Sequence, residues 1–181
     1  MKKYLIVLIL VSTLNGLGQI NKDNSSIKKH TIYGEVFGQG FSGSINYDKI
    51  VNINHKVMNS HTFGLTYTPE SLQFGGGLYV GGHYAYNFIF GKKNNHLDLG
   101  IGISALYNNN WGWGDKIYTY LTPKIGYRYQ RVNGGVFFKA NINVFLALVS
   151  LRKGDVNYFQ EANDIEEAIW PWPGFSLGYT F

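Results

Sequence analysis

Hydrophobic and polar residues alternate along most of the chain from His30 to the C-terminus. Within 96–107, every second residue is apolar or alanine: Leu97, Leu99, Ile101, Ile103, Ala105 and Tyr107. Segments 41–48, 135–149 and 172–181 show the same period of two residues. Such a period is typical of a strand with two unlike faces, whereas an amphipathic helix repeats its apolar residues at spacings of three and four. The pattern therefore predicts an all-β chain.

The alternation divides into eight predicted strands. They lie approximately at 31–38, 41–50, 61–68, 74–90, 96–107, 117–131, 135–149 and 172–181. Several exceed the roughly 5–6 residues of an ordinary strand and match the ~9–11 residues of a tilted strand that crosses a membrane. Residues 31–50 could instead form one strand bent at 38–40, which would leave seven strands. Single-chain outer-membrane barrels have an even number, so parity favours eight and an antiparallel up-and-down transmembrane barrel.

The connections between the predicted strands are of two kinds. With the C-terminus on the periplasmic side, the short segments 91–95 and 132–134 become periplasmic turns, and 108–116 and 150–171 become outer loops. Short inner turns and long outer loops are typical of outer-membrane barrels. Loop 150–171 is the expected contact surface for an extracellular partner, and its segment 160–169 is the only one that indicates a helix.

All four tryptophans fall near the outer ends of predicted strands. They are Trp111, Trp113, Trp170 and Trp172. Because indole rings favour the membrane–water interface, these residues are predicted to form an interfacial aromatic belt.

Residues 1–18 have the features of a secretory signal peptide. Lys2 and Lys3 form a positive start, 4–11 is apolar, and 12–18 is small and polar, so cleavage is expected before Gln19. The apolar core is far shorter than the ~20 residues of a transmembrane helix. The predicted organisation is a signal peptide at 1–18, a flexible polar tail at 19–29 and a barrel domain at 30–181, exported through the Sec pathway to the outer membrane.

Composition adds to this interpretation. Of the 181 residues, 17% are aromatic and 15% are charged, well below the roughly 25% charged residues of a soluble domain. The absence of cysteine excludes disulfides, thiolate metal sites and cysteine nucleophiles. The formal net charge of +5 comes from scattered residues, and without a basic stripe we expect no nucleic-acid binding.

Six charged residues are expected to face the interior of the barrel. They are Glu35, Asp48, Asp98, Lys124, Arg128 and Lys139. An eight-stranded barrel is only wide enough to be filled by side chains, and buried charges need partners. The hypothesis is a structural network of ion pairs in the lumen, with gating of a narrow polar pore as the alternative. Gly100 and Gly102 lie inside a predicted strand, where they are expected to leave room for large neighbouring side chains.

No motif points to catalysis. His83 and His96 are expected to point inward, but no HxH or HExxH spacing is present. Ser42, Ser71 and Ser150 lie near predicted outer strand ends, and none is in a GxSxG elbow. We therefore expect no enzymatic activity, no catalytic residue, no metal site and no cofactor.

Three stretches carry a resemblance to a known family. They are SINYDKI, which contains Tyr47, then FGKKNNHLDLGIGIS, and finally IGYRYQRVNGGVFFKA with the closing PWPGFSLGYTF. Together they resemble the small outer-membrane β-barrel proteins of Bacteroidota, which are loosely akin to the eight-stranded transmembrane domain of outer-membrane protein A. The resemblance covers most of residues 30–181. It implies a fold and a location in a Gram-negative cell, and no catalytic residues.

The closing strand is similar to the signal that the outer-membrane barrel-assembly machinery reads. The residues that carry this likeness are Phe175, Leu177, Tyr179 and Phe181. The resemblance thus implies the assembly machinery and the lipid of the outer membrane as partners.

Three functions remain open from the sequence. The leading one is an integral outer-membrane barrel with a structural or surface-interaction role. The second is a narrow channel or uptake protein for small solutes. The third is a soluble secreted β-barrel that binds an apolar ligand inside, which requires apolar side chains inward and polar ones outward. The long strands, the tryptophan positions and the terminal Phe181 favour the membrane barrel.

Overall fold

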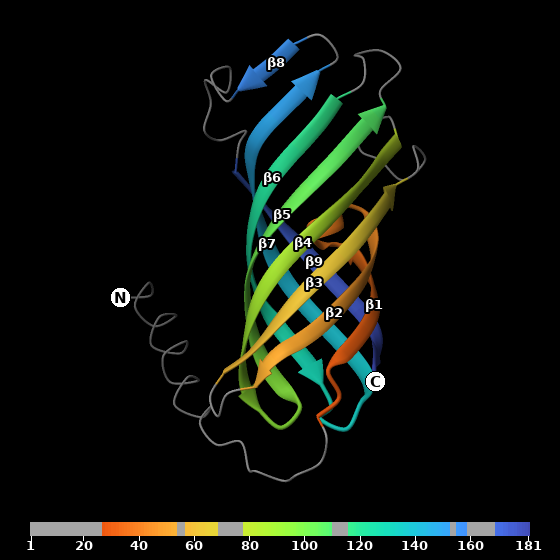
Figure 1. Ribbon diagram of the computed structural model, residues 1–181, viewed down its shortest axis with the longest axis vertical. Helices are drawn as coiled ribbons and strands as arrows, with labels where there is room; N and C mark the ends of the chain where they lie inside the picture. The colour runs from red at the N-terminus through yellow and green to blue at the C-terminus, as the bar shows by residue number, and fades with distance from the viewer. Residues whose placement is uncertain (1–26, 54–56, 69–77, 110–115, 153–154, 159–168) are drawn as a thin grey trace, which may run out of the picture.

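The computed structural model describes residues 27–53, 57–68, 78–109, 116–152, 155–158 and 169–181. These residues form an all-β, antiparallel, closed barrel of eight strands (Figure 1). The wall consists of β1 (His30–Phe37), β2 (Gly43–Ile53), β3 (Val57–Thr68), β4 (Leu78–Lys92), β5 (Asn95–Asn109), β6 (Lys116–Gln130), β7 (Gly135–Arg152) and β9 (Ile169–Thr180). The short strand β8 (Asp155–Tyr158) pairs with the end of β7, beyond the point where β9 begins.

The barrel closes between its first and last strands. β1 pairs with β2 on one side and β9 on the other, and β7 pairs with both β6 and β9. Closure matters because it pairs the backbone groups that an open sheet leaves exposed at its edges. In Figure 1 the lower end of the barrel holds the C-terminus and the turns β4–β5 and β6–β7.

The predicted strands lie close to the observed ones. The choice of two strands over 31–50 is confirmed, because the 3-10 turn η1 (Gly38–Gly40) separates β1 from β2. The strand predicted at 61–68 begins earlier, at Val57. The predicted outer loop 150–171 is shorter in the structure, since β7 continues to Arg152, β8 follows it, and β9 begins at Ile169.

The two faces of the strands also follow the prediction. On β2, Ser44, Asn46 and Asp48 are buried in the interior, whereas Ile45 is 72% exposed on the outer face. The same alternation holds on β5 and β7. In the described part of the chain, no helix has the length and apolar character needed to cross a membrane.

Some predictions concern residues that lie outside the described ones. These include the signal peptide 1–18, tail residues 19–26, Ser71, the first residues 74–77 of the predicted strand 74–90, Trp111 and Trp113, and helix residues 160–168. The end of the predicted flexible tail is described, and it is bound to the barrel. The backbone N–H of Lys28 donates to the carbonyl of Val132 at 3.0 Å, and the N–H of Ile50 donates to the carbonyl of Lys29 at 2.9 Å.

Candidate functional site

Arg128 on β6 lies at the centre of a polar network in the lower half of the barrel. Its Nη2 and Nη1 donate to the Asp48 carboxylate at 2.6 and 3.3 Å, and its Nε donates to Gln130 Oε1 at 2.8 Å. Nη1 also lies 3.6 Å from Asp98 Oδ2, and the guanidinium carbon lies 5.0 Å from the centre of the Phe137 ring. Arg128 is 1% exposed, so these contacts replace its hydration.

Asp48 on β2 receives further hydrogen bonds from the neighbouring strand. Ser60 Oγ and Thr62 Oγ1 each donate to its Oδ2 at 2.8 Å. Asn87 Nδ2 on β4 in turn donates to both hydroxyl oxygens, at 3.1 and 2.9 Å. A buried carboxylate is tolerated when it is paired and hydrogen-bonded, and Asp48 meets both conditions.

Lys124, Lys139 and Glu35 are buried in the lumen but take neutral partners. Lys139 Nζ donates to the Tyr33 hydroxyl at 3.3 Å and lies 5.0 Å from the centre of its ring. Lys124 Nζ donates to Gln39 Oε1 at 3.4 Å. Glu35 accepts from the hydroxyls of Ser44 and Ser176 and from the backbone of Gln39, at 3.5, 3.3 and 3.2 Å.

The six predicted charged residues therefore do not form a single network of ion pairs. All six side chains are at most 8% exposed in the interior. Among the described residues, however, the side chains within ion-pair distance are only Asp48, Asp98 and Arg128. Alternation predicts which side of the wall a residue faces, but not its height along the barrel, and pairing depends on both.

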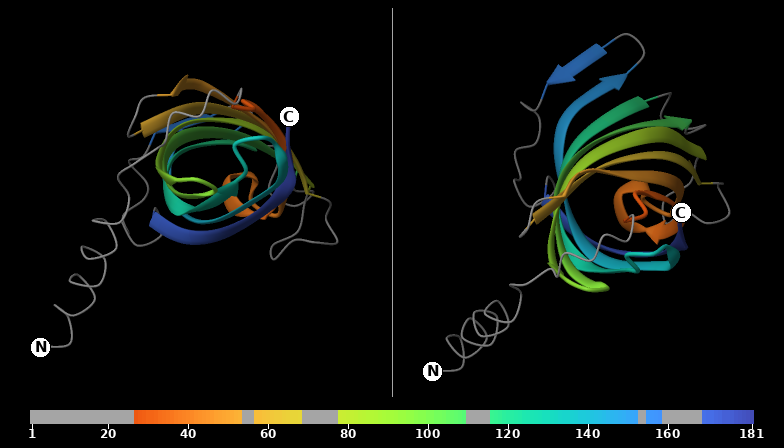
Figure 2. Two further views of the ribbon diagram at one scale, coloured as in Figure 1. Left: turned by 90° about the horizontal axis from the view of Figure 1, so that it is seen from below. Right: turned by 60° about the horizontal axis from the view of Figure 1, so that its bottom comes forward.

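The β1–β2 turn folds into the lumen instead of extending the wall. In Figure 2 the orange turn lies inside the ring of strands. Gln39, at its centre, is 1% exposed. Its Nε2 donates to the carbonyl of Tyr84 on β4 at 3.1 Å, Ser104 Oγ on β5 donates to its carbonyl at 3.4 Å, and its Oε1 accepts from Lys124 on β6. Gln39 thus connects three wall strands across the interior.

The sequence of the turn and of the facing strand permits this insertion. Phe37, Gly38 and Phe41 have left-handed backbone, with φ of 59°, 67° and 66°. A Cβ at Gly38 would overlap the Glu35 carboxyl group, and a Cβ at Gly102 on β5 would overlap the side-chain amide of Gln39. The expectation that Gly102 leaves room for a large neighbouring side chain is thus confirmed, and Gln39 is that neighbour.

Phe41, at the end of the turn, is surrounded by aromatic rings. Its ring centre lies 4.9 Å from that of Phe145 and 6.0 Å from those of Tyr79, Tyr120 and Trp172. These rings come from β7, β4, β6 and β9, so the turn is held from several sides of the barrel. Such aromatic pairs contribute about 0.5–1.5 kcal/mol each beyond their burial, which offsets the left-handed backbone.

Trp172 does not belong to an outward-facing belt. Its Nε1 donates to the carbonyl of Phe41 at 3.0 Å. Trp172 is separated by an even number of residues from Ser176 and Thr180, so it lies on the same inward face of β9 as these two buried side chains. The prediction of a belt position is therefore wrong for Trp172, and the alternation of the closing strand already contained that signal. Trp111 and Trp113 lie outside the described residues, and only the backbone of Trp170 is described.

The closing strand presents its alternate apolar residues outward. Phe175, Leu177, Tyr179 and Phe181 are 48–67% exposed. Their role as an assembly signal stays a prediction.

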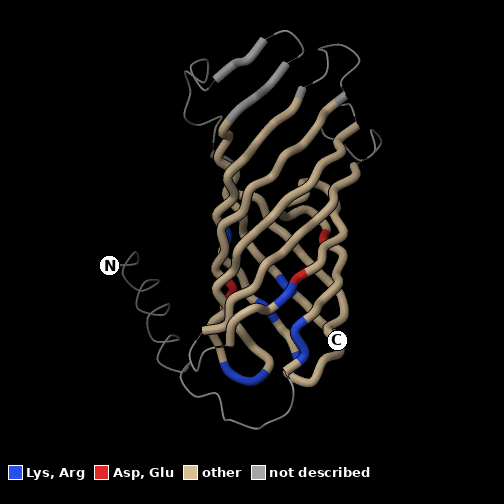
Figure 3. Tube along the Cα trace, in the orientation of Figure 1, with Lys and Arg blue, Asp and Glu red and all other residues tan. Residues whose placement is uncertain are grey.

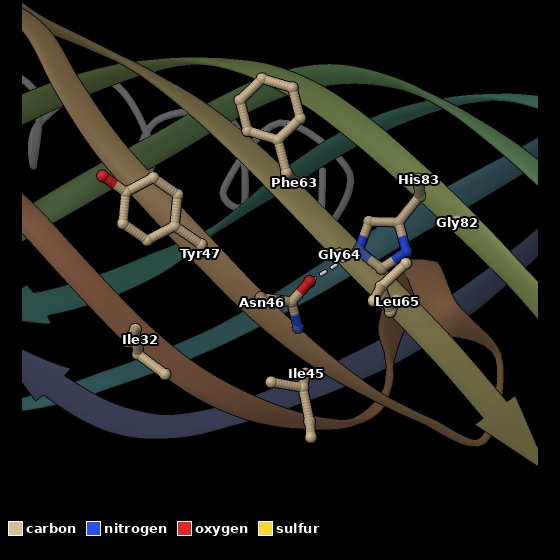
Figure 4. A pocket seen from close by; sticks show the side chains of 9 residues that line it. All are labelled: Ile32, Ile45, Asn46, Tyr47, Phe63, Gly64, Leu65, Gly82 and His83. Atoms are coloured by element: carbon tan, nitrogen blue, oxygen red, sulfur yellow. Dashed lines mark hydrogen bonds between the residues drawn. The ribbon is translucent and has the colours of Figure 1, made fainter.

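A groove of about 480 Å³ runs along the outer face of β1 to β4 (Figure 4). Its outward-facing lining side chains are Ile32, Ile45, Tyr47, Phe63 and Leu65. Gly82 also faces outward, and because it has no side chain it leaves the wall bare at that position. Beneath the wall, His83 Nε2 lies 2.6 Å from Asn46 Oδ1. The groove is thus apolar outside, with a polar pair on its interior side.

Exposed and half-buried cations gather at the lower end of the barrel (Figure 3). We call this group the basic rim; its members are Lys28, Lys29, Lys49, Lys92, Lys93 and Arg131. Backbone hydrogen bonds join its segments: Ile50 to Lys29, Lys28 to Val132, and Gln130 to Asn94.

The basic rim has no acidic counterpart among the described side chains, because Glu35, Asp48 and Asp98 are buried in the lumen. Arg131 Nε donates to the Tyr129 hydroxyl at 3.2 Å, and this hydrogen bond raises the pKa of the exposed guanidinium. The basic rim is therefore a group of cationic side chains with no described acidic side chain beside it.

Within the described ranges, no group of three or more histidine and acidic side chains is placed to hold a metal ion. Comparison of the chain with protein-family models, curated proteins and solved structures found no match. The arrangement of charge and polarity is therefore the basis for a functional proposal.

Proposed function

We propose that this chain is an integral β-barrel protein of the Gram-negative outer membrane, akin to the small Bacteroidota barrels that its sequence resembles. Its role is structural or surface-interacting, without catalysis. A cleaved signal peptide, passage through the Sec pathway and insertion by the barrel-assembly machinery are parts of the same proposal. The connection between β7 and β9, which corresponds to the predicted loop 150–171, is its contact surface for an extracellular partner.

The observation that carries the proposal is the inverted polarity of the closed barrel. Leu65, Ile45 and Leu177 are 75%, 72% and 67% exposed on the outer wall, whereas Arg128 and Lys139 are 1% and 2% exposed inside. In water, burial of apolar area stabilises a fold, so a soluble barrel needs the opposite arrangement. In lipid, an outward apolar band is stable, and closure satisfies the backbone. This distribution weighs against the soluble ligand-binding alternative.

The filled interior weighs against a channel. Arg128 and its carboxylate partners occupy the lower lumen, and Gln39 and Phe41 on the inserted turn occupy the lumen beside β4, β5 and β6. A barrel of this size has an interior just wide enough for side chains. The proposal therefore includes a closed resting state.

Membrane fractionation followed by gel electrophoresis tests the proposal. We expect the mature protein to pellet with the outer membrane and to change mobility between unboiled and boiled samples, because a closed barrel resists SDS until heated. A protein that stays in the periplasm or medium and shows no mobility change contradicts the membrane assignment.

A further inference from the structure

We propose that the outer face of β1 to β4 binds one anionic glycerophospholipid, with an acyl chain in the groove and the phosphate against Lys28, Lys29 and Lys49. This inference rests on the proposed membrane location and goes beyond it, because it assigns a specific lipid to one side of the barrel. The remainder of the apolar wall contacts lipid without such selection.

The groove and the three lysines are connected by a continuous row of outward-facing residues on β2. Ile45, Tyr47 and Lys49 are successive outward residues of β2, all exposed. Successive outward residues of a strand lie about 6.8 Å apart, so Lys49 lies just beyond the lower end of the groove that Ile45 and Tyr47 line. Lys49 also pairs with His30, which brings the exposed Lys28 and Lys29 to the same level.

The side chains between the groove and the basic rim have the amphipathic character that suits the boundary between acyl chains and headgroups. The Tyr47 hydroxyl lies 2.6 Å from His30 Nδ1, so its polar end points toward the basic rim while its ring lines the groove. Around the same end of the barrel, the hydroxyls of Tyr127 and Tyr129 are bound to Asn95 and Arg131. Tyrosine is characteristic of this interface because it combines an apolar ring with a polar tip.

The sign of the charge selects an anionic headgroup. None of Lys28, Lys29 and Lys49 forms an ion pair within the described part of the chain. A lysine near a membrane surface attracts anionic lipid by about 1 kcal/mol, and three act together here. The volume of the groove, about 480 Å³, is within the roughly 300–1,000 Å³ of small-molecule sites.

Native mass spectrometry of the detergent-refolded mature protein tests the inference. The probes are phosphatidylglycerol and phosphatidylcholine with identical acyl chains, and glycerol 3-phosphate as a free headgroup. We expect phosphatidylglycerol to bind at least about tenfold more tightly than phosphatidylcholine, and glycerol 3-phosphate not to bind, because it lacks the chain. A mobility change on unheated gels of the same sample reports separately whether the barrel has formed.

Two variants test the lysines and the groove separately. K28Q/K29Q/K49Q should bring the affinities for the two lipids within about twofold of each other. G82L should fill the groove and weaken both lipids alike; it fits the fold, because a Cβ at Gly82 has its nearest neighbour at 3.5 Å. The matched controls should leave both affinities unchanged. They are A140L on the outer face of β7 and K116Q/R152Q/K153Q, which changes the first residue of β6, the last residue of β7 and the residue that follows it in the sequence.

A folded wild-type protein that binds the two lipids equally overturns the inference and leaves the membrane location intact. Binding of free glycerol 3-phosphate with the same affinity as the lipid, or an unchanged preference in the lysine variant, overturns it as well. A protein that never forms a heat-modifiable barrel contradicts the proposed function itself.

Discussion

Arg128 is the side chain of the described interior that faces two buried carboxylates, those of Asp48 and Asp98. Asp48 has other donors, but neither oxygen of Asp98 has a hydrogen bond in the described residues. Asp98 therefore depends on the guanidinium 3.6 Å away. Loss of one partner of a buried ion pair is costly because the remaining charge is left in a medium that solvates it poorly.

R128M should accordingly lower the free energy of unfolding by about 3–5 kcal/mol. Unfolding of the refolded protein in micelles by guanidinium chloride, monitored by tryptophan fluorescence, measures this change. R131M removes the same charge from an exposed turn and serves as the control; it should shift stability by less than about 0.5 kcal/mol. Equal effects of the two substitutions would show that the lumen pairs do not stabilise the barrel.

A second residue-scale prediction concerns Gly38. A Cβ here meets the Glu35 carboxyl group on a backbone with φ of +67°. G38A should destabilise the barrel by about 1–3 kcal/mol. G34A is the matched control on the same strand region, because a Cβ at Gly34 meets nothing within 4 Å. The same titration checks both, and a destabilised G34A with an unaffected G38A would contradict the assigned geometry.

At the scale of elements, the inserted β1–β2 turn distinguishes this barrel from a simple meander. Alternation predicted the strands and their faces because a residue's side of the sheet follows from parity alone. Gly38 and Gly40 indicated a bend, but they carry no information on its direction. That direction depends on Tyr84, Ser104 and Lys124, which contact Gln39 from three strands far along the chain.

The turn should act as a plug. Wild-type protein in planar bilayers is expected to show no steady conductance, because Gln39 and Phe41 fill the lumen between the wall strands. Q39A/F41A removes both side chains and should produce conducting events. I45A, which shortens an outward side chain, is the control and should remain silent. Conductance in the wild type would instead revive the narrow-channel alternative.

At the scale of the whole molecule, charge gives the barrel two unlike ends. The basic rim, the C-terminus and the short turns share the lower end, while β8 extends the opposite one. The sequence pattern predicted this separation of turns from loops. It did not predict the basic rim, because Lys28, Lys49 and Arg131 are scattered along the chain and are brought together only by closure.

This polarity predicts an orientation. Because the chain has no cysteine, N94C and N157C each introduce a single reactive thiol, one in the β4–β5 turn and one in β8. A membrane-impermeant maleimide added to intact cells should label N157C and not N94C, and lysis should make both reactive. The reverse pattern in intact cells would place the basic rim outside.

The pairing of β1 with β9 also constrains the order in which the barrel can assemble. Thr31 and Thr180 are adjacent in the wall, with a hydroxyl–hydroxyl distance of 3.0 Å, although 149 positions separate them in the chain. Contacts between such distant residues make folding slow, because a long loop must close before they form. Until the last twelve-residue strand arrives, β1 has an unpaired edge and Glu35 lacks Ser176. A nascent or truncated chain therefore keeps an open sheet edge, which is a site for unwanted pairing with other chains until the barrel closes.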